Sequence, residues 1–216
     1  MRETVIQKVT DSKIIAIIRG LAEEKCLMLA DALYAGGIEM IEVTFNNSRP
    51  EEFFKTANSI RAINDHFGGK VLAGAGTVTS PALVEMAADA GAKYIISPDT
   101  NIEVIEKTRS LGLVSMPGAL TPTEIMTAHN AGADFVKVFP AANLGSAYIR
   151  AIRAPINHVK LLAVGGINGD NVKEFLQAGV MGFGIGGNLT NKQWIEAGEY
   201  HKITALAKEL IAKVKE

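Results

Sequence analysis

The stretch AGADFVKVFPA, residues 131–141, contains the pattern that decides the fold: a glycine closes a helical segment and a short apolar run follows. Glycine suits the left-handed position that ends many helices. Runs of consecutive apolar residues are typical of strands covered on both faces, as in parallel sheets. The same pattern recurs in AGGIEMIEVTF (35–45), AGAKYIISP (90–98), LGLVSMPGA (111–119) and AGVMGFGIGG (178–187).

Further apolar runs bring the series to eight: IIAIIR (14–19), VLAGAG (71–76) and KLLAVGG (160–166). Helical patterns separate the runs, and one begins with Ser80 as N-cap and Pro81 at the first helical position. Eight alternating strand and helix units predict an α/β protein with a (β/α)8 TIM barrel. A doubly wound open sheet is the alternative, because alternation alone does not show whether the sheet closes.

The barrel is expected to form a single domain over residues 1–216, because no linker or change of composition divides the chain. A short helix is expected over residues 2–11, before the first strand. A final amphipathic helix is expected over residues 193–216.

Composition and charge exclude several classes of protein. The chain has 216 residues, 48% of them hydrophobic, which excludes a disordered protein. Its net charge is −1 without any block of like charge, so we expect no nucleic acid and no membrane as partner. The first residues lack the apolar core of a secretory signal, and no run approaches the about 18 apolar residues of a membrane span. A cytoplasmic location is therefore expected.

A lysine stands in the middle of the apolar run FVKVFP, residues 135–140. Alternation along a strand places Phe135, Lys137 and Phe139 on one face. If that face points into the barrel, burial disfavours the ammonium and lowers its pKa, which gives a nucleophilic amine. The alternative is a lysine that extends from the strand edge to solvent.

The run MIEVTF carries a carboxylate in a similar position. Met40, Glu42 and Thr44 share one face of this predicted strand. A buried glutamate either pairs with a cation or serves as an acid or base. A purely structural ion pair with Lys137 is the alternative.

Other candidates lie at the carboxyl ends of strands, where barrels carry their active sites. Arg19 ends the first strand, and its planar guanidinium suits a carboxylate or phosphate, although a loop salt bridge would also explain it. Thr77 follows the third strand and can donate a hydroxyl hydrogen bond. Pro98 ends the fourth strand as a rigid pocket wall or as a simple turn. Phe139, on the Lys137 face, is expected beside them.

The last two strands end in glycine pairs, Gly165 with Gly166 and Gly186 with Gly187. Barrels frequently bind phosphate at these two loops, where bare backbone N–H groups face the anion. Tight turns are the alternative, and they explain one pair more easily than both. A phosphate site is therefore predicted.

No metal and no cofactor are expected. The four histidines fall on helices or before strands, so they form no cluster at the strand ends. The stretch GFGIGG (182–187) matches a dinucleotide-binding pattern formally, but it lies at the last strand and no strand–helix–strand unit follows it.

These residues together define a class of chemistry. Lys137 would condense with a ketone to form a protonated Schiff base, and Glu42 would move the protons of the reaction. One alternative is a phosphate-binding isomerase or synthase that forms no Schiff base. Another is an inactive barrel that binds a phosphorylated metabolite, with Lys137 and Glu42 as a structural pair.

Nearly the whole chain resembles the family of 2-keto-3-deoxy-6-phosphogluconate (KDPG) and 4-hydroxy-2-oxoglutarate (KHG) aldolases. The resemblance is carried by AIIRG (16–20), GGIEMIEVTFN (36–46), GAGTV (74–78), Ser97-Pro98, PGALTPTE (117–124), GADFVKVFPA (132–141) and the VGGI and GIGGN loops. It implies that Lys137 is the Schiff-base lysine and Glu42 the proton-transfer residue. It further implies that Arg19 and Thr77 bind the substrate carboxylate and that the glycine loops bind phosphate.

The resemblance implies reversible cleavage of a 2-keto-3-deoxy-6-phospho sugar acid to pyruvate and D-glyceraldehyde 3-phosphate by a homotrimer. It extends to cleavage of 4-hydroxy-2-oxoglutarate to pyruvate and glyoxylate. Asn46 stands where the gluconate enzymes usually have Arg, and Val164 where they have Thr. Both departures resemble the branch that acts on the galactonate epimer. Gly187 replaces a common Ser, which leaves the phosphate more to backbone N–H groups.

Overall fold

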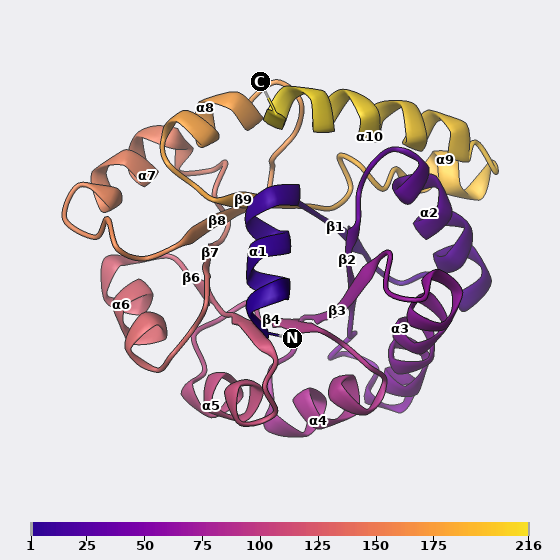
Figure 1. Cartoon of the computed structure of the whole chain (residues 1–216), viewed down its shortest axis with the longest axis horizontal. Helices are drawn as coiled ribbons and strands as arrows, with labels where there is room; N and C mark the ends of the chain where they lie inside the picture. Colours follow the sequence, from indigo (N-terminus) through magenta and orange to yellow (C-terminus); the bar gives the residue numbers. More distant parts are fainter. Residues whose placement is uncertain (1, 216) are drawn as a thin grey trace.

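The computed structural model of the protein describes residues 2–215. Its parallel strands form one sheet in the order β5-β4-β3-β2-β1-β9-β8-β7-β6, which curls into a nearly closed ring with helices outside it (Figure 1). The prediction of a TIM barrel is confirmed. The strands are β1 (Ile14–Ile18), β2 (Met40–Thr44), β3 (Leu72–Gly76), β4 (Tyr94–Ile96), β5 (Val114–Met116), β6 (Gly118–Ala119), β7 (Val136–Val138), β8 (Leu161–Val164) and β9 (Gly182–Ile185).

The described residues form nine strands rather than the predicted eight, because the fifth apolar run divides in two. Pro117 lies between β5 and β6, and it has no N–H to donate to a neighbouring strand. On one side of it β5 pairs with β4, and on the other β6 pairs with β7. The two ends of the sheet are thus consecutive in the chain, and this segment closes the barrel.

The helices form where the sequence supplies capping and apolar faces. The predicted N-cap of one, Ser80, accepts a hydrogen bond from the Leu83 N–H. The helices are α1 (Arg2–Ser12), α2 (Glu23–Ala35), the 3-10 turn η1 (Pro50–Glu52), α3 (Phe53–Phe67), α4 (Pro81–Asp89), α5 (Ile102–Ser110), α6 (Pro122–Asn130), α7 (Gly145–Arg153), α8 (Val172–Gln177), α9 (Lys192–Glu196) and α10 (Tyr200–Lys215). Within residues 2–215, no helix has both the length and the apolar character of a membrane span.

The predicted N-terminal helix is present as α1, whereas the predicted tail helix over 193–216 is wrong as a single element. Helices α9 and α10 replace it. Gly198 separates them with a φ of 72°, a left-handed conformation that interrupts a helix. Residue 216 lies outside the described part of the chain.

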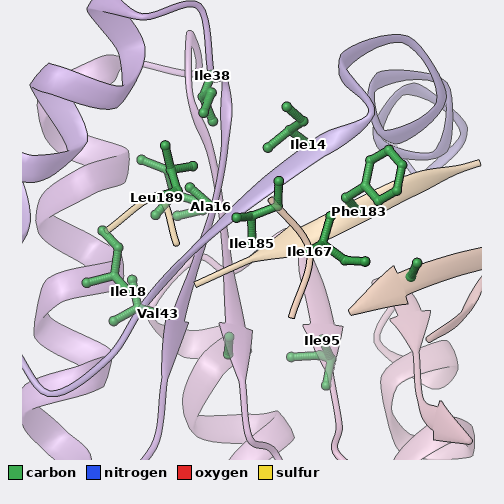
Figure 2. Packing of buried hydrophobic residues seen from close by; sticks show 14 of the residues in the cluster. Ile14, Ala16, Ile18, Ile38, Val43, Ile95, Ile167, Phe183, Ile185 and Leu189 are labelled. Atoms are coloured by element: carbon green, nitrogen blue, oxygen red, sulfur yellow. The ribbon is translucent and has the colours of Figure 1, made fainter. Parts of the chain in front are cut away.

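Alternation along the strands separates two layers of apolar packing. Figure 2 shows Ile14, Ala16 and Ile18 along β1 beside Phe183 and Ile185 of β9, all in the layer between strands and helices. The intervening residues of β1 point into the barrel instead. Inward-facing positions are therefore limited in number, and a polar side chain among them is held in an apolar interior.

Helix α1 closes the barrel at the amino-terminal ends of its strands. It lies across the ring of strands in Figure 1. Val5 and Val9 of α1 belong to the same buried cluster as Met40, Tyr94 and Phe135, which stand at or just before the start of their strands. The opposite, carboxyl-terminal end of the barrel is left for a ligand.

Candidate active site

All ten residues selected from the sequence line one cavity of about 920 Å³ at the carboxyl-terminal end of the barrel. They reach it from seven strands or the loops that follow them, which explains why they are dispersed in the sequence. They are Arg19, Glu42, Thr77, Pro98, Lys137, Phe139, Gly165, Gly166, Gly186 and Gly187.

Lys137 enters the cavity from the inner face of β7. Its neighbours Val136 and Val138 pack outward against the helices, so alternation turns the lysine inward. The residue is only 7% exposed, and its Nζ lies 4.8 Å from the centroid of the Phe139 ring. Burial lowers the pKa of Lys137 below its ordinary value of 10.5, while the carboxylate of Glu42 opposes that shift. The site thus favours a neutral amine at lower pH than free lysine would.

Glu42 enters the cavity from β2 and is 2% exposed. Burial raises the pKa of its carboxyl group above 4.5, and the positive charges of Lys137 and Arg19 partly offset that rise. A carboxyl group whose pKa is raised can both accept and release a proton near neutral pH.

Lys137 and Glu42 influence one another without direct pairing. In the described residues no hydrogen bond or ion pair joins the two side chains, although the charge of each shifts the pKa of the other. Both line the same cavity, so the reacting atom of a ligand can lie between the amine and the acid. This arrangement differs from the structural ion pair that the sequence left open.

Arg19 and Thr77 meet at one side of the opening. The Arg19 Nη1 donates to the Thr77 Oγ1 at 3.4 Å. Thr77 has a φ of 57°, an uncommon conformation for a β-branched residue. Strained backbone of this kind costs about 1–3 kcal/mol and is concentrated at functional sites. A guanidinium beside a hydroxyl group can bind a carboxylate through two kinds of donor.

The glycine pairs follow β8 and β9 and line another part of the opening. Gly165 and Gly166 have φ values of 93° and 75°, which side chains rarely adopt. A Cβ on Gly166 would also lie 2.5 Å from the Cβ of Ala142. Around Gly187, by contrast, a Cβ would meet nothing within 4 Å, so this position has room for a ligand or a larger side chain.

The loop after β9 adds cavity residues that the sequence did not single out. Thr190 donates to the Ile17 carbonyl at 3.1 Å, and Asn188 donates to the Ile167 carbonyl at 2.9 Å. These bonds fold the loop over the opening, where Lys192 also lines the cavity. A cation close after the last glycine pair is a signal in the sequence that could have identified it.

The two positions that depart from the gluconate pattern lie in different places. Val164 lines the cavity beside Lys137, at the end of β8. Asn46 lines a separate cavity, and its Oδ1 accepts from the Ser48 hydroxyl at 2.7 Å. Val164 is therefore the one of the two that a ligand beside Lys137 can touch.

Within residues 2–215, no group of three or more His, Cys, Asp or Glu side chains is arranged to hold a metal ion. The polar groups described above are instead an amine, a carboxyl group, a guanidinium and exposed backbone N–H groups. They suit an organic anion that carries a carbonyl group.

Comparison with known proteins gives a consistent result. Residues 5–206 match the family model described as KDPG and KHG aldolase. The chain is 35% identical to the 2-dehydro-3-deoxy-6-phosphogalactonate aldolase of Escherichia coli K12, over 83% of this chain and 85% of that protein. It is 32% identical to the 2-dehydro-3-deoxy-phosphogluconate aldolase of Treponema pallidum, over 96% of each.

A solved structure of KDPG aldolase from Legionella pneumophila superposes with a TM-score of 0.86 at 28% identity, covering 97% of this chain and 98% of that one. That structure contains pyruvate captured as a covalent carbinolamine intermediate.

Proposed function

The chain belongs to the KDPG and KHG aldolase family, and from this premise we propose how its residues carry out the reaction. The protein is a class I aldolase, a carbon–carbon lyase that cleaves a 2-keto-3-deoxy phospho sugar acid. The roles of individual residues, the preferred epimer and the assembly are the proposal.

Lys137 is the nucleophile. Its neutral amine attacks the C2 ketone of the sugar acid and forms a carbinolamine, which loses water to give a protonated Schiff base. The lowered pKa of Lys137 supports this role, because only the neutral amine attacks. The carbinolamine held by the Legionella relative is the first of these two species.

Glu42 moves the protons. It accepts the proton of the C4 hydroxyl group, directly or through water, while the C3–C4 electron pair moves to the iminium. The aldehyde leaves, and the enamine that remains on Lys137 takes a proton at C3 from Glu42. Water then attacks the Schiff base and releases pyruvate, which restores the amine. The raised pKa of Glu42 supports both directions of transfer.

The two ends of the substrate bind at different parts of the opening. Arg19 and Thr77 hold the carboxylate next to C2, with Pro98 and Phe139 as the walls around the reacting carbons. The phosphate rests on the backbone N–H groups of the four glycines. Lys192 supplies the positive charge at that end.

The substrate proposed is the galactonate epimer, because Val164 lines the cavity without a hydroxyl group to bond the C4 oxygen. Cleavage of 4-hydroxy-2-oxoglutarate to pyruvate and glyoxylate would use the same amine and acid. We propose further that the single domain of residues 1–216 assembles as a homotrimer in the cytoplasm. Light scattering tests this assembly, and the expected molar mass is three times that of one chain.

The observation that carries the proposal is the burial of the Lys137 amine inside the barrel beside an acid to which it is not paired. The test is to incubate the protein with pyruvate, add borohydride and measure the intact mass. One reduced pyruvyl group should add to the wild type and to Lys160→Ala, a lysine at the other end of the barrel, but not to Lys137→Ala.

Different results would support different functions. Aldol cleavage without a trapped adduct would indicate an enzyme that uses Lys137 only as an acid or base. Binding of a phosphorylated sugar acid without adduct or turnover would indicate a binding protein. Either result would contradict the proposed residue roles.

A further inference from the structure

The inner face of β3 carries two glycines, Gly74 and Gly76, and β9 carries Gly182 and Gly184 in the same alternation. Ala73 and Ala75 of β3 pack outward in the layer of helices, so alternation turns both β3 glycines into the barrel. Neither has a positive φ. The backbone therefore does not require glycine at these positions, and the reason must lie in the space beside them.

The carboxyl group of Glu42 occupies the space at Gly76. A Cβ built on Gly76 would lie 2.6 Å from the Glu42 Cγ, and it would overlap the Cδ and Oε1 atoms. In the register of the sheet Glu42 stands opposite Gly74, whereas its carboxyl group lies at Gly76, two residues nearer the opening. The side chain thus tilts along the barrel toward the ligand cavity.

The Tyr94 ring occupies the space at Gly74, directly beneath. A Cβ on Gly74 would lie 2.5 Å from the ring carbon Cζ. Tyr94 is fully buried, and its hydroxyl donates to the Leu72 carbonyl at 3.4 Å. The ring therefore fills the layer below the carboxyl group and prevents Glu42 from folding down into the barrel.

Packing rather than hydrogen bonding fixes the acid. Within residues 2–215 no hydrogen bond or ion pair reaches the Glu42 carboxyl group, so the shape of the surrounding packing limits where its oxygens can lie. An overlap at Gly76 would force the carboxyl group to rotate toward or away from Lys137. Proton transfer is sensitive to such a change, because a displacement of about 1 Å can cost roughly a hundredfold in rate.

We propose that Gly76 is a positioning residue for the acid–base Glu42, and that Tyr94 in the space of Gly74 supports it from below. This inference rests on the proposed role of Glu42. On this proposal, glycine is needed at position 76 for proton transfer by Glu42 and not for the backbone conformation of β3.

The test separates Schiff-base formation from proton transfer in one reaction, that of pyruvate. Borohydride trapping reports bond formation at Lys137, and NMR exchange of the pyruvate C3 hydrogens with D₂O reports proton transfer. In Gly76→Ala we expect exchange to fall about a hundredfold. Trapping should stay within about twofold of the wild type, since Lys137 is unchanged.

The matched control is Gly182→Ala. Gly182 is a buried barrel glycine outside the cavity lining, and its Cβ would lie 2.7 Å from the Lys13 carbonyl oxygen. The Gly182→Ala variant overpacks the barrel as Gly76→Ala does, so the thermal stability of the variant should fall. The ratio of exchange to trapping should stay at the wild-type value, because the acid is not displaced.

A shorter acid should relieve the overlap. In Glu42→Asp the carboxyl group withdraws by one methylene, so adding Gly76→Ala to Glu42→Asp should reduce exchange by less than about threefold, against about a hundredfold in the wild-type background. This double variant also provides the test if Gly76→Ala alone does not fold.

The inference is overturned if Gly76→Ala exchanges pyruvate hydrogens as fast as the wild type. It is also overturned if Gly76→Ala lowers the exchange rate as much in the Glu42→Asp background as in the wild-type background. Failure of the proposed function is seen separately: the wild type would then trap no pyruvate at Lys137.

Discussion

Lys137 and Glu42 shift each other's pKa across the barrel, although strands β1, β9 and β8 lie between the strands that carry them. The relationship is possible because both side chains lean into one cavity at the same end of the sheet. It makes the protonation of the amine depend on the state of the acid, and this dependence can be measured.

Glu42→Gln should separate the two functions. Pyruvate trapping should persist, while kcat for aldol cleavage falls by about 10²–10⁴, the usual range for a lost acid–base group. The rate of trapping should rise with pH as Lys137 loses its proton. Because the Glu42 carboxylate raises the pKa of Lys137, its removal should shift the midpoint of that rise to lower pH.

The control for this variant is Glu103→Gln, an exposed carboxylate outside the cavity lining. Its midpoint should match the wild type. Unchanged turnover in Glu42→Gln, or a midpoint that moves to higher pH, would contradict the proton-transfer role.

Val164→Thr should change epimer preference. Threonine is close to valine in volume and adds a hydroxyl group beside the reacting carbons. One hydrogen bond to the C4 oxygen is worth about 1 kcal/mol, so the ratio of kcat/KM for gluconate to galactonate epimer should rise about fivefold. Side-by-side assays of the two phospho sugar acids measure it. An unchanged ratio of kcat/KM would show that residue 164 does not discriminate between the two configurations at C4.

Lys192→Gln should weaken binding of the phosphorylated end. Loss of one charged partner should raise KM for the phospho sugar acid by roughly tenfold, which corresponds to about 1.4 kcal/mol. The rate of pyruvate trapping should not change, because pyruvate has no phosphate. Lys208→Gln, an exposed lysine of α10, removes the same charge outside the cavity and should leave KM unaltered. An equal rise in KM in both variants would show that the phosphate does not bind beside Lys192.

Asp134→Asn should destabilise the fold without altering chemistry. The Asp134 side chain is 3% exposed, receives the Ser115 N–H at 2.9 Å and pairs with Arg2 of α1 and Arg109 of α5. Loss of hydrogen bonds to a buried charge should lower the free energy of unfolding by about 2 kcal/mol, measured by urea titration.

Glu3→Gln provides the comparison, because Glu3 also pairs with Arg2 but its side chain is 83% exposed. An exposed pair contributes about 0–1 kcal/mol, so this variant should unfold nearly as the wild type does. Equal stability of the two variants would show that Asp134 does not fasten α1 to the barrel.

Much of the fold and the location of the site follow from local patterns. Alternation within one short strand places Lys137 on the face opposite Val136 and Val138, and Glu42 on the face opposite Ile41 and Val43. The glycine that follows several of the helices marks the start of the next strand in the same local way.

What the sequence does not reveal depends on contacts between distant segments. The division of the fifth strand at Pro117 depends on which neighbour each half pairs with, and composition does not specify this. Lys192 reaches the cavity only because Thr190 bonds to the Ile17 carbonyl, at the other end of the chain. The reason for glycine at position 76 becomes clear only from the three-dimensional structure, in which the Glu42 carboxyl group lies beside it.

Within residues 2–215, helix α1 sets Val5 and Val9 into the starts of the strands, and the ligand cavity opens at the carboxyl-terminal end of the barrel. Reactant and both products must then pass through the same opening in order. In the proposed reaction the aldehyde lies outermost with its phosphate, while pyruvate remains bonded deeper, at Lys137. The aldehyde therefore departs first and pyruvate last, which makes pyruvate the product that competes with the sugar acid for the free enzyme.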